Sequence, residues 1–341
     1  MQQYQLISRW IQGDIPQKII PWQIDIDTTN ICNQDCYYCN SSNFRTNSPV
    51  YQKVEKYLKL IDDFHNWRSY DPNVVGTINN IIFSGGGEPT LLPRYETIIE
   101  SCIDKGFVVA MNTNGTRLNK LLSLSPEKLT KMAYIGLDID SAVKSTYESI
   151  RRSKMSTSPF DRIKNVAKQL GSLNAPIDIK ALMMEHNTTD KELEELFIYA
   201  KEVNARGLHF RPLVLDDKSF IASEKVLDKI QSLSKQYSIS NTVSLGRYEK
   251  RIYSRCHQMF LFPSFCSDGN IYLCCEYKGR EDLKLCSWID DDWRSIWGSD
   301  KHLQLYNNFR TVFCKPCRPN TTNNLIQDNI NDRSKVIQSF I

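Results

Sequence analysis

Three cysteines that lie close together raise the question of what this chain does. Cys32, Cys36 and Cys39 are spaced C-x3-C-x2-C within the stretch DTTNICNQDCYYCN. A structural zinc site needs four closed ligands, commonly two C-x2-C pairs, and the nearest histidine is His65. Iron–sulfur clusters are also bound by thiolates, and three thiolates leave one iron open to a substrate or cofactor. The spacing therefore favours a reactive iron–sulfur cluster, with a zinc or structural cluster completed by a distant ligand as the alternative.

The overall composition limits the class of protein. The chain has 341 residues, a net charge of +4 and eleven cysteines, of which seven follow residue 250. It contains no long apolar run and its N-terminus does not have the pattern of a secretory signal, so we expect a cytoplasmic protein without a membrane partner. Cysteines are reduced in that compartment, so clustered ones indicate metal or redox chemistry. Lysine and arginine are dispersed along the chain, and we expect no nucleic-acid partner.

Strand-like and helix-like segments alternate over the first two thirds of the chain. Ile24 and Ile26 alternate with aspartates, whereas Val54, Leu58 and Ile61 recur at helical spacing. The expected strands are 22–29, 79–89 with its glycine-rich turn, 107–115, 134–140, 176–184 and 207–215, and the expected helices are 54–64, 95–106, 125–132, 160–171 and 190–203. Six such repeats predict an α/β fold, a partial (β/α)6 TIM-like barrel, because a closed barrel needs eight. Functional residues should then follow the carboxyl ends of the strands.

The last part of the chain reads as a small cysteine-rich α+β extension. A helix is expected near 221–237, a β-hairpin around Asp268–Gly269, a short helix at 291–299, and a loosely ordered tail at 320–333. The predicted division is an N-terminal extension (1–21), a barrel (22–220), a helical linker (221–250), a cysteine-rich domain (251–318) and a C-terminal tail (319–341).

The three-cysteine loop resembles that of the radical S-adenosylmethionine (SAM) enzymes. Their hallmark is C-x3-C-x2-C after the first strand, with an aromatic residue before the last cysteine; the matching residues are Cys32, Cys36, Tyr38 and Cys39. The resemblance implies a 4Fe-4S cluster whose open iron binds SAM. It also implies reductive cleavage of SAM to a 5′-deoxyadenosyl radical, with the protein supplying orientation and exclusion of water.

Further motifs of this family occur at matching positions. The turn SGGGEP resembles the glycine-rich turn that meets the methionyl amino group, and Glu88 would face that ammonium or brace the turn. A guanidinium suits the methionyl carboxylate, and either Arg151 or Arg152 is expected there. The full set of expected SAM residues is Tyr38, Gly85, Gly86, Gly87, Glu88, Asn112, Asn114, Asp138 as a ribose partner, and Arg151.

The later cysteines resemble a twitch or SPASM-like auxiliary-cluster domain of the same family. This resemblance implies a second 4Fe-4S cluster held by Cys256, Cys274, Cys314 and Cys317, with Cys275 able to replace its neighbour Cys274. Zinc in four thiolates fits the same spacing chemically.

Family members with such a domain mostly modify ribosomally made peptides or proteins, and the resemblance is greatest to the peptide-modifying members, including the peptide epimerases. We therefore expect a precursor peptide as substrate, L-to-D epimerisation at Cα, and a low-potential electron donor such as flavodoxin or ferredoxin. Cys266 and Cys286 are the candidate thiol donors of the returning hydrogen atom. The alternatives are oxidative cross-linking or thioether formation, a dehydrogenase acting on a small molecule, and a non-catalytic zinc protein.

Two further features bear on the peptide. Only about twenty residues precede the first expected strand, too few for a leader-recognition domain, so either a separate protein or the barrel face itself would bind the leader. Trp288, Trp293 and Trp297 would either line a peptide groove or lie in the core.

Overall fold

A parallel sheet forms the centre of the molecule. The computed structural model describes residues 3–13, 18–45, 49–70, 74–76, 78–214 and 220–331. The six expected strands are present, in parallel and in chain order, as β2 (Gln23–Ile26), β4 (Asn80–Phe83), β5 (Val108–Thr113), β6 (Tyr134–Asp138), β7 (Ile177–Met183) and β8 (Gly207–Pro212). The predicted partial barrel is confirmed.

Additional strands extend this sheet at both edges. β9 (Ser240–Val243) pairs in parallel with β8, and β10 (Ser264–Phe265) pairs in parallel with β2. The predicted hairpin is formed by β10 and β11 (Asn270–Tyr272), followed by the antiparallel β12 (Lys284–Ser287). β1 (Lys18–Ile19) and β3 (Val74–Val75) make a separate short pair. The cysteine-rich region is thus joined to the barrel edge by main-chain hydrogen bonds, next to the strand that leads to the three-cysteine loop.

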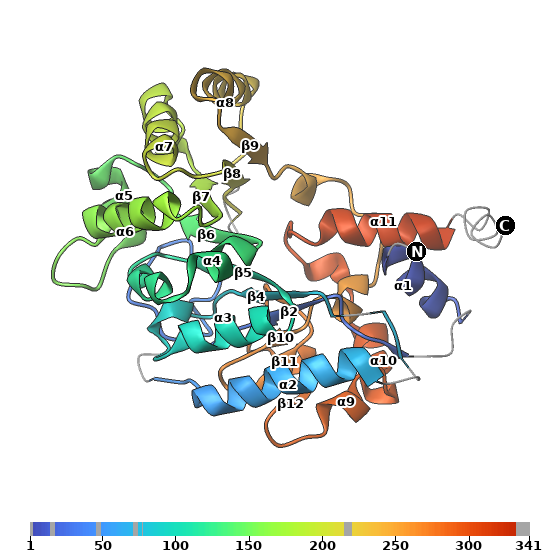
Figure 1. Cartoon of the computed structure of the whole chain (residues 1–341). Helices are drawn as coiled ribbons and strands as arrows, with labels where there is room; N and C mark the ends of the chain where they lie inside the picture. The colour runs from blue at the N-terminus through green and yellow to red at the C-terminus, as the bar shows by residue number, and fades with distance from the viewer. Residues whose placement is uncertain are drawn as a thin grey trace.

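Helices cover the sheet. They are α1 (Gln3–Ile11), α2 (Val54–Tyr70), α3 (Tyr95–Asp104), α4 (Pro126–Lys131), α5 (Lys144–Arg151), α6 (Phe160–Ser172), α7 (Asp190–Glu202), α8 (Glu224–Tyr237), α9 (Trp293–Ile296), α10 (Asp300–Asn308) and α11 (Asn320–Asn331) (Figure 1). The expected helices are present as α2, α3, α4, α6, α7, α8 and α9. Ser125 caps α4 by accepting from the Lys128 amide, and Gly106, at φ 75°, follows the end of α3. Among the described helices, none is long and apolar enough to span a bilayer.

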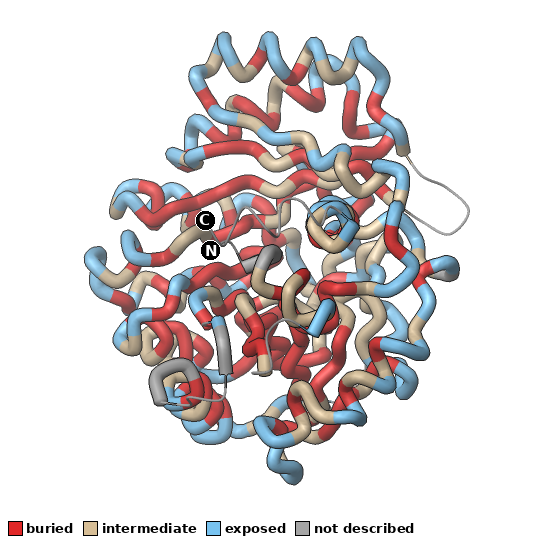
Figure 2. Tube along the Cα trace, turned by 90° about the vertical axis from the view of Figure 1, so that its right-hand side faces the viewer, coloured by how far each residue is buried: buried red, intermediate tan, exposed pale blue. Residues whose placement is uncertain are grey.

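The two faces of the sheet differ in chemistry. Successive side chains of a strand point to opposite faces, and one set, including Ile24, Ile26 and Phe83, belongs to the apolar core. The other set, including Asn112 of β5 and Asp138 of β6, lines an inner cleft. Figure 2 shows the buried residues concentrated along the strands and the exposed ones on the outer turns of the helices. The strand side chains that point away from the cleft are therefore apolar and buried, and those that line the cleft are polar.

The expected loosely ordered tail is wrong for the described part of 320–333. α11 packs against α1 near the two chain ends (Figure 1), and Asn320 and Asn323 are buried. The Asn320 amide donates to the carbonyls of Gly246 and Glu249, and the Asn323 oxygen accepts from the Gln258 amide. Composition predicted a solvated segment because asparagine is usually exposed; here asparagines satisfy buried main-chain groups instead.

The three C-terminal tryptophans lie in the core. Trp288, Trp293 and Trp297 are buried, and Trp297, which is fully buried, donates its indole N–H to the Ile19 carbonyl at 2.7 Å. Trp293 packs edge-on against Phe64, at 5.6 Å between ring centroids. These side chains attach the extension to the barrel.

Replacing Trp297 by alanine should lower the free energy of unfolding by about 3–5 kcal/mol, because it leaves a large cavity and an unpaired carbonyl. Urea unfolding of the metal-free protein measures this loss. Ile221→Ala, at a side chain that is 75% exposed, is the control and should change stability by less than about 0.5 kcal/mol. Equal losses in the two variants would contradict the packing described.

Candidate active site

A single cleft of about 430 Å³ lies at the carboxyl ends of the barrel strands. Its volume is in the range of small-molecule and cofactor sites. All residues expected for the first cluster and for SAM line it: Cys32, Cys36, Tyr38, Cys39, Gly85, Gly86, Gly87, Glu88, Asn112, Asn114, Asp138 and Arg151. The cleft thus collects residues from five segments far apart in sequence, and their individual roles stay predictions.

The three-cysteine loop is held in a compact turn. The Cys39 amide donates to the Cys36 carbonyl at 3.2 Å, and Arg45 donates to the Gln34 carbonyl at 2.7 Å. The Asn114 amide group lies 3.8 Å from the Cys32 sulfur. Burial, and then the charge of Glu88, raise the pKa of Cys32 to about 11. A cationic iron centre would offset this cost by stabilising the thiolate.

The glycine-rich turn lies directly against the cysteine loop. The Gly87 amide donates to the Thr29 carbonyl at 2.9 Å, and the Glu88 amide donates to the Ile31 carbonyl at 2.7 Å. A Cβ at Gly87 would lie 2.0 Å from the Ile31 carbonyl oxygen. The turn needs glycine here because only a residue without a side chain fits this approach.

Glu88 braces the turn. Its carboxylate is buried and accepts from the Asn114 amide at 2.7 Å, from the Thr113 hydroxyl at 2.6 Å, and from the amide and hydroxyl of Thr90. Burial raises the pKa of Glu88, and these donors oppose the rise. Protein donors occupy both carboxylate oxygens, so the contacts of Glu88 fit the expectation that it braces the turn.

Arg151 and Tyr38 converge on one carboxylate. The Arg151 guanidinium lies 2.8 Å from Asp140, whose carboxylate also accepts from the Tyr38 hydroxyl and from the Leu182 amide. Arg151 lines the cleft, whereas Arg152 is exposed and lies over the ring of Tyr37. Of the two arginines considered for the methionyl carboxylate, Arg151 is the one that lines the cleft, and its role there stays a prediction.

Sequence reasoning missed several residues that line the cleft. One of them is Asp140. The sequence contained a signal for it, because it lies two residues after Asp138 in the expected strand 134–140, and alternate residues of a strand point to the same face. Arg211 and Arg247 also line the cleft, with Arg211 at 3.5 Å from Asp138. No motif marks these arginines, which come from β8 and from the loop after β9.

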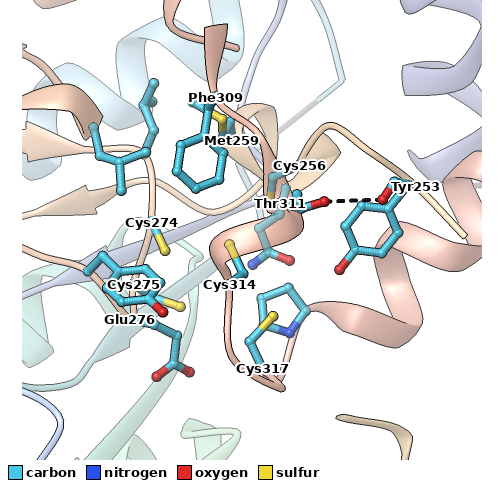
Figure 3. A pocket seen from close by; sticks show the side chains of 15 residues that line it. Tyr253, Cys256, Met259, Cys274, Cys275, Glu276, Phe309, Thr311, Cys314 and Cys317 are labelled. Atoms are coloured by element: carbon cyan, nitrogen blue, oxygen red, sulfur yellow. Dashed lines mark hydrogen bonds between the residues drawn. The ribbon is translucent and has the colours of Figure 1, made fainter. Parts of the chain in front are cut away.

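The auxiliary cysteines line a second cavity. Cys256, Cys274, Cys275, Cys314 and Cys317 all border it, and Figure 3 shows the thiols of Cys274 and Cys314 pointing toward one another. Burial raises the pKa of Cys274, as do its neighbours Cys275 and Cys256. The Cys275 sulfur instead lies 4.0 Å from the Arg318 guanidinium, and the other charges that act on it include Glu276, Asp25 and Lys278. This arrangement favours Cys274 over Cys275 as the ligand.

Both cavities offer thiols, which bind zinc as well as iron–sulfur clusters. Within the described ranges, no three side chains of His, Cys, Asp or Glu lie close enough together to hold one ion, whereas zinc requires sulfur at about 2.3 Å. An iron–sulfur cubane is itself several ångströms across, so its thiolates stand farther apart. The three thiolates of the cysteine loop on the cleft fit an open cluster, and four of the five around the second cavity would fit a closed one.

The two candidate hydrogen donors lie outside both cavities. Cys286 is buried in the apolar core. Cys266 is buried beside Asp27, with its sulfur 3.5 Å from the carboxylate. A Cβ at Gly86, which lines the cleft, would lie 3.0 Å from that same carboxylate. Cys266 is therefore separated from the cleft by one side chain and one glycine.

Comparison with known proteins identifies the family. The profile described as the Radical SAM superfamily matches residues 26–200, just over half of the chain. The chain belongs to the radical SAM superfamily. This family uses a 4Fe-4S cluster together with SAM, and the cysteine-rich region of this radical SAM protein fits an auxiliary cluster.

Curated relatives are distant. The chain is 22% identical over 239 residues to a tungsten-containing aldehyde ferredoxin oxidoreductase cofactor-modifying protein of Pyrococcus furiosus, covering 67% of this chain and 62% of that protein. It is 24% identical over 161 residues to an S-adenosylmethionine-dependent nucleotide dehydratase of Selenomonas ruminantium, covering 47% of this chain and 54% of that protein. The chain thus spans only part of the length of these relatives.

Solved structures share the fold over most of the chain. Streptococcus suis SuiB bound to the precursor peptide SuiA superimposes with a TM-score of 0.65 at 14% identity, covering 88% of this chain and 69% of SuiB. The enzyme anSMEcpe with bound AdoMet gives a TM-score of 0.57 at 16% identity, covering 84% of this chain and 80% of that one. The fold that this radical SAM protein shares with these structures therefore extends into its cysteine-rich region.

Gly87→Ala should weaken SAM binding by about tenfold or more, because the methyl group would push the glycine-rich turn away from the cysteine loop. Equilibrium binding of SAM to the cluster-loaded protein measures the loss. Gly13→Ala is the control, since nothing lies within 4 Å of the Cβ position of Gly13, although its own φ is 84°. If both variants bind SAM equally well, the close approach at Gly87 does not contribute to SAM binding.

Replacing an auxiliary ligand should remove one cluster only. Cys256→Ala and Cys314→Ala are expected to lower the iron content from about eight to about four atoms per chain after anaerobic reconstitution. Cys275→Ala should retain about eight. Iron and sulfide assays together with absorbance near the usual cluster band make the comparison, and a Cys275 variant with halved iron would reverse the ligand assignment.

Proposed function

We propose that this radical SAM enzyme modifies a ribosomally made peptide, by L-to-D epimerisation at Cα. The observation that carries the proposal is the composition of the single cleft. The SAM residues form one wall and Glu276, Tyr277 and Lys315 of the cysteine-rich region help to form another. A substrate bound beside SAM would therefore lie between the barrel and this region, which we propose is a twitch or SPASM-like domain over 251–318.

The fold comparisons support a peptide as the substrate. SuiB is described with the precursor peptide SuiA bound, and anSMEcpe is described with AdoMet and the Cp18Cys peptide bound. The cleft of this chain has charged groups of both signs on its walls, including Arg211, Arg247 and Asp138. Such walls suit a polar, extended ligand more than a compact apolar one.

When bound, the cluster and SAM supply a 5′-deoxyadenosyl radical that removes a hydrogen atom from the substrate. Epimerisation then needs a hydrogen atom returned to the opposite face of Cα. Cys266 suits this role because burial, and then Asp27, raise the pKa of its thiol well above the usual value. The sulfur thus retains its S–H group, since a thiolate has no hydrogen to give.

The returned hydrogen atom leaves a sulfur radical on the protein. One electron from the external reductant and one proton from solvent restore the thiol, so the peptide changes configuration without net oxidation. Cys286 is the second candidate donor, but its place in the apolar core gives it no path to the cleft. Cys275 is a third thiol near the barrel interior, 4.0 Å from the Arg318 guanidinium.

One observation favours oxidation as a second candidate function. Cys317, Glu276 and Tyr277 line both the cleft and the auxiliary cavity. A substrate radical could therefore pass its electron to an auxiliary cluster across one shared wall, which would produce a cross-link or thioether, or a dehydrogenated small molecule.

The two reactions separate in heavy water. The enzyme is co-expressed with candidate precursor peptides, and each peptide is analysed by mass spectrometry and by chiral analysis of its residues. Epimerisation predicts a single deuterium gained per converted residue with no other change, whereas oxidation predicts the loss of two hydrogen atoms. Loss of two hydrogens, or no change in any peptide, would overturn the epimerase proposal.

Cys266→Ala should abolish deuterium gain while 5′-deoxyadenosine still forms with a strong reductant, because hydrogen abstraction does not need the thiol. Cys286→Ala is the matched control, another buried cysteine whose loss should leave deuterium gain intact. Epimerisation that survives in Cys266→Ala would exclude Cys266 as the donor. If no 5′-deoxyadenosine forms in the parent protein, the radical SAM activity itself fails.

A further inference from the structure

A basic face covers the auxiliary cavity. It consists of two adjacent segments, 250–256 and 310–312, joined by hydrogen bonds from the Thr311 amide to the Ser254 carbonyl and from the Thr311 hydroxyl to the Tyr253 carbonyl. Lys250, Arg255 and Arg310 are exposed on it. In the sequence, no aspartate or glutamate occurs from 250 to 267 or from 301 to 327. The local charge is therefore strongly positive in a chain whose net charge is only +4.

These cations have no carboxylate partner among the described residues. Arg255 lies over the ring of Tyr306, at 5.8 Å to the centroid, and Arg310 donates only to main-chain carbonyls of its own helix end. No ion pair involves Lys250, Arg255 or Arg310 in the described ranges. Cations without internal partners are available for long-range attraction of an acidic partner.

Apolar side chains are exposed within the same face. Val312 is 76% exposed and Ile252 is 44% exposed, the former more than any other large apolar side chain reported as exposed in the described residues. Exposed apolar side chains on segments that also carry exposed charges are typical of a transient protein interface. The face is thus built to bind another protein and not only to remain soluble.

The same two segments supply the auxiliary cysteines. Cys256 follows Arg255 directly, and Cys314 is two residues after Val312. Arg251 connects the segments, because its guanidinium donates to the carbonyls of Thr311 and Lys315. A protein bound on this face would therefore lie close to the segments that supply the auxiliary cysteines. The auxiliary cavity in turn shares Cys317, Glu276 and Tyr277 with the SAM cleft.

We propose that the basic face of residues 250–256 and 310–312 is the docking site of a small acidic one-electron carrier protein. The inference rests on the proposed function, because radical SAM chemistry needs one external electron for each SAM cleaved. The carrier is oxidised by one electron and the iron–sulfur centres of the enzyme are reduced by one. No bond forms between the two proteins and no atom is transferred.

The placement decides between this partner and an acidic leader peptide. A leader peptide must position a substrate in the cleft, but Lys250, Arg255 and Arg310 are not among the residues that line the cleft. Electron transfer requires only proximity to a redox centre. The position of the face therefore fits a redox carrier.

The test uses the cluster-loaded, full-length enzyme and photoreduced recombinant flavodoxin, an acidic carrier. The double variant Lys250→Glu/Arg255→Glu should lower flavodoxin-driven 5′-deoxyadenosine formation by about tenfold or more at low salt. The Kd for flavodoxin, measured by calorimetry without turnover, should rise by a similar factor. In the parent enzyme, flavodoxin-driven 5′-deoxyadenosine formation should slow and the Kd for flavodoxin should rise as the salt concentration is raised, because screening shortens the reach of surface charge.

Two controls separate docking from damage. Reduced methyl viologen, a small cation that needs no docking face, should drive 5′-deoxyadenosine formation equally in the parent and in the double variant. Lys225→Glu/Lys235→Glu makes the same charge change on exposed positions of α8 and should leave the flavodoxin Kd unchanged. Iron content should equal that of the parent in both double variants.

The proposal is overturned if Lys250→Glu/Arg255→Glu binds flavodoxin with the parent Kd, or if the α8 control variant weakens binding as much. Failure of the proposed function gives a different result. The parent enzyme would then form no 5′-deoxyadenosine even with reduced methyl viologen, while the comparison of Kd values would still decide whether the face binds the carrier.

Discussion

The site depends on one buried carboxylate. Glu88 accepts hydrogen bonds from Thr90, Thr113 and Asn114, while its own amide donates to Ile31 in the cysteine loop. A buried carboxylate is costly unless such donors compensate for lost water. Because they do, Glu88 holds together loops from three different strands. Ligand cysteines and cofactor residues have a common geometry only while these loops stay in register.

A second buried charge attaches the cysteine-rich region to the barrel. Lys278 lies 2.7 Å from Asp27, and both side chains are almost fully buried. Burial alone would lower the pKa of Lys278, but Asp27 together with Cys266 and Asp25 outweighs burial and raises it. Buried pairs of this kind add little net stability but strongly penalise separation of the partners. The pair therefore fixes the position of the cysteine-rich region against the barrel. Cys266 and the Gly86 turn both lie beside Asp27 of this pair, and the pair so helps to place the auxiliary cavity beside the cleft.

The sequence predicted what depends on local pattern. The C-x3-C-x2-C spacing, the glycine run and the six strand–helix repeats are all local, and the residues chosen from them line one cleft. Features that depend on packing between distant segments were not predictable. α11 is stabilised by buried asparagines whose partners lie about seventy residues away, as in the Asn320 bond to Glu249. Arg247 likewise reaches the cleft only because the loop after β9 turns back across the barrel.

The same geometry sets the fate of a substrate radical. Cys266 lies behind Gly86 on the barrel side of the cleft, and Cys317 lies on the opposite, auxiliary side. A radical formed in between can gain a hydrogen atom from one side or lose an electron to the other. Hydrogen transfer needs contact between the two atoms, whereas electron transfer tolerates separation. In the proposed reactions, the outcome would therefore depend on how closely the cleft holds the substrate to the Gly86 turn, behind which Asp27 separates Cys266 from the cleft.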